Sequence, residues 1–284
     1  MIRLDAATVA LQWATGGLAF LWVTTRRREV GLGYGWLLRA VYGVMAVGAV
    51  VAARLLRPVP ARDVAAALTA AATGAVLVVS VARRRAGVRG ERARQERRSA
   101  RVAAMTGIDR AAKVRDPEAR EFAPVLDAIA PLIGTAGLVA AGIGAGGPHV
   151  LAVVRILVGA AFLGAVSDAM LLGHWYLVQP GLGRGPLLEL NRWVGWTWPL
   201  EVAALLWPTG MVSVLDGRVD DGYKGLLGWF WVACAVSTIA LVLVTKAALK
   251  ERAYSAVMAA TGLLYLAILM AFGTDLVARA ILAR

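Results

Sequence analysis

The sequence predicts an all-α integral membrane protein that crosses the bilayer about eight times. Hydrophobic residues make up 59% of the 284 residues, and they gather in repeated runs of roughly 20, the length of a helix that spans a bilayer. The sequence does not show the short alternating segments that build a β-barrel. The formal charge of +13 lies mainly between the apolar runs. There it indicates membrane orientation and contact with anionic membrane lipids, and it argues against nucleic acid as a partner.

The apolar runs form a single membrane domain, and each run is close to the length of a tilted transmembrane helix. The fourth run has the weakest pattern, because Asp127 and Pro131 interrupt it and its end is rich in glycine. The expected spans are approximately 6–24, 35–56, 62–82, 122–143, 149–176, 187–212, 224–247 and 254–276.

Basic residues predict which side of the membrane each connection occupies. Clusters of arginine and lysine follow the first, third and seventh runs, whereas the arginines of 54–62 lie at the opposite end and are outnumbered. Because connections rich in Lys and Arg remain in the cytoplasm, we expect these three clusters there and both termini outside. A composition rich in Ala, Arg, Gly and Val is typical of a bacterium, so the expected location is the bacterial cytoplasmic (inner) membrane.

The segment 83–121 is the only long connection outside the membrane, and its position predicts a basic cytoplasmic loop. Mixed charges and good helix formers favour a surface helix in its first half. Two interpretations stay open: a solvated linker that touches lipid headgroups, or a docking site for a cytoplasmic or membrane partner, for which other subunits of a membrane complex are the expected candidates. The acidic second half and the scarcity of aromatic residues argue against nucleic acid.

Residues 38–56 resemble residues 154–172 in register, with arginine, glycine, alanine and valine at matching positions. These spans would run antiparallel, as the halves of an inverted-repeat transporter do. Small residues at helix-packing faces explain the same similarity without a repeat.

Polar and aromatic residues gather in the segment 167–201, across the fifth and sixth spans. Polar groups in a bilayer are costly, so this concentration indicates a functional site. The short turn at 181–186 makes the two spans adjacent and antiparallel, which should place both groups of side chains at one membrane level. The candidate ligand-binding residues at this cytoplasmic end are His174, Tyr176, Gln179, Asn191, Arg192 and Trp196.

Two carboxylates lie deeper in the same spans: Asp168 at intermediate depth and Glu201 near the middle of the bilayer. Desolvation disfavours the charged form of a buried carboxylate, so such a group can exchange protons near neutral pH. Asp168 and Glu201 therefore predict a proton relay that leads inward from the cytoplasmic surface.

A histidine can ligate haem iron or hydrogen-bond a quinone carbonyl, and Arg192 can neutralise a quinone anion. His149 and His174 are separated by 25 residues on one span, roughly 37 Å, and cannot ligate one haem. Quinone is therefore the favoured cofactor over haem b, and no motif for a metal site is present. An interfacial aromatic belt, and an ion pair between Arg192 and Glu189, explain the same residues without a ligand.

Three functions stay open at this point. The first is a membrane subunit of a respiratory or other electron-transfer complex, which binds quinone near His174 and Arg192 and relays protons through Asp168 and Glu201. The second is a secondary transporter or ion channel that uses Asp168 and Glu201 as coupling residues. The third is a structural or assembly subunit that docks through 83–121. The sequence leaves open whether the protein is an enzyme.

Overall fold

The computed structural model describes residues 5–84, 122–145, 148–179, 182–208, 210–251 and 253–283. Within these residues every regular element is a helix, and seven helical segments are long and apolar enough to cross a membrane. This confirms the prediction of an all-α, multi-pass membrane protein. The seven segments are α1 (Ala6–Thr25), α2 (Leu32–Leu55), α3 (Pro60–Ala82), η1 with α5 (Pro124–Ala128 and Ile129–Gly144), α6 (His149–Val178), α9 (Leu226–Ala248) and α10 (Tyr254–Leu282).

The expected sixth span, 187–212, differs from the structure. Helix α7 (Gly185–Leu206) is long enough to cross a membrane but is not among the seven apolar segments. The reason is its charge, because any part of α7 long enough to cross a membrane contains the three ionisable residues Glu189, Arg192 and Glu201. The helix then ends at Leu206, because Pro208 cannot continue it, and a short helix α8 (Gly210–Leu215) follows. The predicted single span is therefore two helices.

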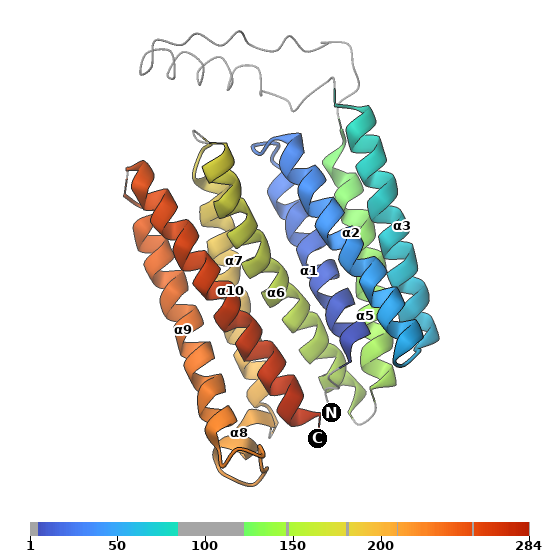
Figure 1. Cartoon of the computed structure of the whole chain (residues 1–284), viewed down its shortest axis with the longest axis vertical. Helices are drawn as coiled ribbons and strands as arrows, with labels where there is room; N and C mark the ends of the chain where they lie inside the picture. The colour runs from blue at the N-terminus through green and yellow to red at the C-terminus, as the bar shows by residue number, and fades with distance from the viewer. Residues whose placement is uncertain are drawn as a thin grey trace.

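The described helices form two halves that lie side by side (Figure 1). Helices α1, α2, α3 and α5 pack in one ring, α6, α7, α9 and α10 pack in the other, and α1 contacts α6 where the halves meet. The two termini lie at one end of the bundle, opposite the end of α3 (Figure 1). In this arrangement α1 corresponds to α6 and α2 to α7, which resembles a parallel duplication. The sequence similarity between 38–56 and 154–172 instead joins α2 to α6, helices with different places in the two rings.

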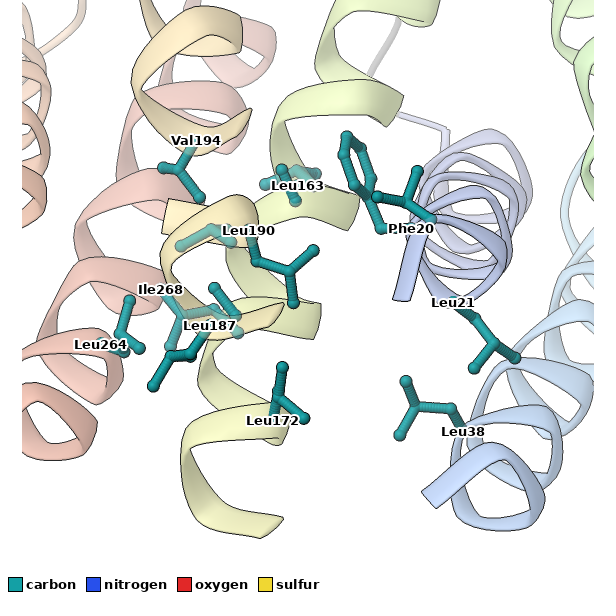
Figure 2. Packing of buried hydrophobic residues seen from close by; sticks show 14 of the residues in the cluster. Phe20, Leu21, Leu38, Leu163, Leu172, Leu187, Leu190, Val194, Leu264 and Ile268 are labelled. Atoms are coloured by element: carbon teal, nitrogen blue, oxygen red, sulfur yellow. The ribbon is translucent and has the colours of Figure 1, made fainter. Parts of the chain in front are cut away.

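The two halves meet through small residues on α1 and α6. A β-carbon added to Gly16 would overlap the backbone carbonyl of Ala160, and one added to Gly164 would overlap the backbone of Gly16. Small residues allow two helix backbones to approach this closely, and close packing is a main source of helix association in a bilayer. Around this contact, Phe20 and Leu163 belong to a buried apolar cluster that α2, α7 and α10 complete (Figure 2).

The chain between α8 and α9 folds around Asp221, which is buried although it lies outside the membrane-spanning segments. Burial raises the pKa of this carboxyl, but four backbone N–H donors outweigh burial and hold the pKa below its ordinary value. The donors are the amides of Tyr223 (2.8 Å), Gly225 (2.9 Å), Leu227 (2.8 Å) and Gly228 (3.3 Å). Asp221 thereby caps the first turn of α9, whose free N–H groups need acceptors.

Enlarging the contact between the halves should destabilise the protein. We expect Gly164→Ala to lower stability by about 1–3 kcal/mol, because the α1 backbone cannot move aside without separating the halves. Gly262→Ala is the matched control, since Gly262 lies on α10 with open space around it and should be neutral or stabilising. Thermal unfolding in detergent, followed by tryptophan fluorescence, measures both. Equal stabilities of the two variants would contradict this packing.

The loop around Asp221 should make stability depend on pH. Because its folded-state pKa is depressed, the stabilising effect is complete above the ordinary carboxyl pKa and is lost as pH falls through the depressed value. The difference in melting temperature between wild type and Asp221→Asn should therefore shrink on acidification through that range. Asp220→Asn, which alters an exposed neighbour, should show a much smaller difference at every pH.

Candidate functional site

The six residues predicted to bind a ligand lie on different faces of α6 and α7. His174 is exposed, and its Nδ1 lies 3.0 Å from the hydroxyl of Tyr265 on α10. Tyr176 is buried and donates a hydrogen bond to the carbonyl of Gly183. The side-chain oxygen of Gln179 accepts a hydrogen bond of 2.9 Å from the indole of Trp175. These contacts tie the three side chains to three separate neighbours.

The α7 members of the group also diverge. Asn191 is buried and donates to the carbonyl of Val242 on α9 at 3.0 Å. Arg192 and Trp196 are exposed. Glu189, considered as a partner for Arg192, pairs instead with the arginines that follow α1, Arg26 at 2.5 Å and Arg27 at 3.2 Å. The structure therefore does not gather this group around one ligand, and the quinone site stays a prediction.

Asp168 lies at the interface between the two halves. Its side chain is fully buried, and its Oδ1 accepts a hydrogen bond of 2.5 Å from the hydroxyl of Tyr42 on α2. Its Oδ2 has no hydrogen-bond partner among the described residues. The neighbouring Ser167 hydroxyl accepts from the indole of Trp13 on α1 at 2.8 Å. Asp168 is thus a buried carboxyl with one free oxygen.

Glu201 belongs to a different group, nearer the end of the bundle where the termini lie. We call this group the Glu201 cluster, and its members come from four helices of both halves. Within it, Glu201 interacts electrostatically with Asp275, Arg279 and Arg155. All of these side chains are buried. The cluster consists of Gln12 on α1, Arg155 on α6, Glu201 on α7, and Asp275 and Arg279 on α10.

Gly159 on α6 is the point on which several cluster side chains converge. A β-carbon at this position would lie 2.5 Å from Nε2 of Gln12, 2.9 Å from Oδ1 of Asp275 and 3.2 Å from Nη2 of Arg279. The absence of a side chain at Gly159 therefore allows polar groups from α1 and α10 to reach the backbone of α6. A larger residue there would displace them.

The two arginines of the cluster have different partners. Arg155 donates from Nε to the carbonyl of Ala204 and from Nη2 to the carbonyl of Trp207, each at 2.8 Å. These are carbonyls at the end of α7, where the helix has no backbone donors left to offer. Arg279 instead forms an ion pair with Asp275 one turn earlier on α10, with 2.8 Å between Nε and Oδ2. Arg155 therefore fixes the helix end, whereas Arg279 pairs with a carboxyl of the cluster.

Most polar atoms of the Glu201 cluster have no hydrogen-bond partner among the described residues. Buried polar atoms of native proteins are nearly always paired, so a concentration of exceptions is unusual. Ionisable groups concentrated inside a membrane bundle make the cluster a candidate functional site. The unpaired atoms are both carboxylate oxygens of Glu201, Oδ1 of Asp275, Nη1 and Nη2 of Arg279, and both amide atoms of Gln12.

The two predicted relay carboxylates lie at separate levels of the bundle. Arg155, which interacts with Glu201, precedes Asp168 by 13 residues on α6, roughly 20 Å along the helix axis. Glu201 is also only five residues from the end of α7, and so lies nearer one end of the helix than expected. The described contacts place the two carboxyls in different groups.

Sequence reasoning did not identify Gln12, Asp275 or Arg279 as site residues. Asp275 and Arg279 are four residues apart near the end of an apolar run, a spacing that gives a helical ion pair. The expected eighth span ended at residue 276 and so excluded Arg279, whereas α10 continues to Leu282. The spacing of Asp275 and Arg279 within one continuous apolar helix was therefore the sequence signal that could have identified these two residues.

A third buried charged group is fully paired. Arg39 on α2 forms a two-pronged ion pair with Asp127 of η1, at 2.7 Å from Nε and 2.8 Å from Nη2. Its Nη1 donates to the hydroxyl of Ser80, and Asp127 also accepts from the hydroxyl of Thr25. Every charge has a partner, so this group fastens the ends of α1, α2, α3 and η1 together. This pairing explains why a carboxylate, Asp127, occurs within the predicted fourth span.

Comparison with protein-family models, with curated proteins and with solved structures found no match. Within the described residues, no three side chains of His, Cys, Asp or Glu are placed to hold a metal ion. The residues 85–121, which contain most of the predicted basic loop, lie outside the described part of the chain.

The paired group gives a stability test. Asp127→Leu should destabilise the protein by about 3–5 kcal/mol, because it leaves the Arg39 guanidinium buried without its counter-charge. Adding Arg39→Met should recover much of that loss, since the buried charge is then removed as well. Thermal unfolding of wild type, both single variants and the double variant measures the coupling. Additive losses in the double variant would show that the pair is not the source of the effect.

Proposed function

We propose that this protein is a secondary transporter or ion channel that couples ion movement to the Glu201 cluster. The observation that carries the proposal is the set of unpaired, fully buried polar atoms on Glu201, Asp275 and Arg279. Buried charges without full hydrogen bonding lower stability, and intramembrane charges mark ion and proton pathways in membrane proteins. Asp168, with its one free oxygen, is proposed as a second carboxyl on the pathway.

The position of the cluster supports the same proposal. Its side chains come from α1 in one half and from α6, α7 and α10 in the other. Sites for substrate and coupling ion in many transporters lie at the interface of two structural repeats. Movement of one half against the other would change how Gln12 of α1 meets the charged side chains of the cluster.

The electron-transfer alternative rests on His174, Arg192 and their neighbours. His174 and Arg192 point to the exterior of the bundle, whereas Tyr176 and Asn191 point inward. The structure adds no observation in favour of a quinone or haem site, so transport is the better-supported proposal.

We also propose that the end of the bundle opposite the termini faces the cytoplasm of a bacterium. The arginines after α1 and the lysines near the end of α9 lie at that end. At the other end two arginines are neutralised, because Arg62 pairs with Asp5 and Asp63, and Arg218 pairs with Asp216. This orientation places both termini outside, in the cytoplasmic membrane, with anionic lipids as partners at the basic end.

Current recordings test the function. Purified protein is reconstituted in vesicles on a solid-supported membrane, and H⁺, Na⁺ and K⁺ jumps are applied in turn. We expect a current for at least one ion, and a decrease on the order of tenfold or more in Glu201→Gln, because an intramembrane charge on the pathway is removed.

Glu189→Gln is the matched control, since it removes a carboxylate of the same helix that lies outside the cluster and pairs with Arg26 and Arg27. It should retain most of the current. A wild-type protein that gives no current with any of the three ions would contradict the proposal, as would an unchanged current in Glu201→Gln.

A further inference from the structure

The carboxyl groups of Glu201 on α7 and Asp275 on α10 are both fully buried, near the ends of these two helices, which meet in one apolar cluster through Leu205 and Ala278. They are close enough to form a hydrogen bond with each other. Two ionised carboxylates cannot form that bond, because each offers only acceptors. With both ionised, both oxygens of Glu201 and Oδ1 of Asp275 are buried and have no partner in the described part of the chain. One proton placed between them turns one carboxyl into a donor, and the two groups then satisfy each other.

We propose that Glu201 and Asp275 form a proton-binding pair that holds one proton between them, and that this proton is the ion which the Glu201 cluster couples. This inference rests on the proposed transport function and names its ion. Two carboxyls that share a site behave as one titrating unit, as in the paired aspartates of aspartic proteases.

The charged groups around the pair favour a proton over a metal cation. Arg279 lies in the same cluster and already contacts Asp275, so its guanidinium would repel a metal ion beside that carboxyl. Nitrogen donors of Gln12 and Arg279 also reach the same point on α6 as Asp275 Oδ1, where a metal ion would require oxygen ligands. A proton needs only the two carboxyl oxygens.

The other elements packed against the pair add few charges. On α6 the facing charge is Arg155, which is held by two backbone carbonyls. On α1 the facing side chain is the uncharged Gln12, and α8 contains no titratable residue. On α9 the titratable residue beside α10 is Cys234, which contacts Gly273. Glu201, Asp275 and Arg279 are therefore the charged side chains that act on one another most directly in the cluster.

Arg279 supplies the means of release. Its Nε donates a hydrogen bond to Asp275, whereas Nη1 and Nη2 have no hydrogen-bond partner within the residues that the structure describes. When the shared O–H bond breaks, the electron pair stays on the carboxylate and the proton passes to a water molecule. The free end of the guanidinium can then donate two parallel hydrogen bonds to the newly ionised Glu201, an arrangement that arginine and carboxylate favour. The cluster thus alternates between a shared proton and a second arginine contact.

Infrared spectroscopy of the purified, folded protein tests the pair directly. Asp168→Asn serves as the parent variant, because Asp168 is a separate buried carboxyl that could contribute its own band. We expect a carboxylic-acid C=O band that shifts in D₂O, disappears at high pH and corresponds to one group. Glu201→Gln and Asp275→Asn, each added to the parent, should both alter this band and its titration. Glu189→Gln should leave it unchanged.

The infrared spectra can contradict the proton-binding pair in two ways. A band that neither Glu201→Gln nor Asp275→Asn changes would overturn it, as would a parent spectrum without a band. If Glu201→Gln does not fold, Glu201→Asp and Asp275→Glu replace the neutral variants, and both should shift the band by changing the separation of the carboxyls.

Infrared spectra recorded in sodium chloride and in choline chloride at the same pH distinguish a bound proton from a bound sodium ion. The band should not depend on sodium, whereas a band that weakens as sodium rises would assign the site to an alkali cation. The same experiments separate this inference from the transport proposal. If sodium drives currents that depend on Glu201 but the shared-proton band is absent, the protein is a transporter or channel and only the proton pair is overturned.

Discussion

The close approach of α1 to α6 is the contact on which the rest of the structure depends. Gly16 and Gly164 allow the two backbones to touch, and this brings both four-helix halves into register. The same approach brings Gln12 of one half to Gly159 of the other. A protein in which these helices were separated by ordinary side chains would keep its long helices but would lose the meeting point of its polar groups.

Two groups of buried charge show how the same residue types serve different ends. Arg39 and Asp127 form an ion pair in which hydroxyls occupy the remaining hydrogen-bonding positions. Arg279 and Asp275 form an equally buried pair but leave their outer atoms free beside Glu201. Removing charge from water is costly in both groups, and only the first is repaid by complete pairing. The second retains polar atoms without a hydrogen-bond partner among the described residues.

Helix α7 shows how a polar helix is accommodated in a membrane bundle. It is the least apolar of the long helices, and its inward face carries Asn191 and Glu201. Neighbouring helices shield these groups, and Arg155 secures the end of the helix where the chain bends into α8. A polar helix can remain in the bundle because Asn191 and Glu201 face protein and not lipid.

The sequence by itself determined the class of the protein, because the length and apolarity of each run decide whether a helix can span a bilayer. It also predicted that Asp168 and Glu201 are carboxyls at membrane depth in neighbouring helices, and the structure shows both of them buried. It did not determine partners: Asp168 bonds to Tyr42 across the two halves, Glu201 joins Asp275 and Arg279, and His174 lies on the outside. Which face of a helix meets which neighbour depends on packing between segments more than 100 residues apart in some cases, as for Tyr42 and Asp168. Only the tertiary structure decided these contacts, since hydropathy gives the depth of a residue and carries no information on the direction in which its side chain points.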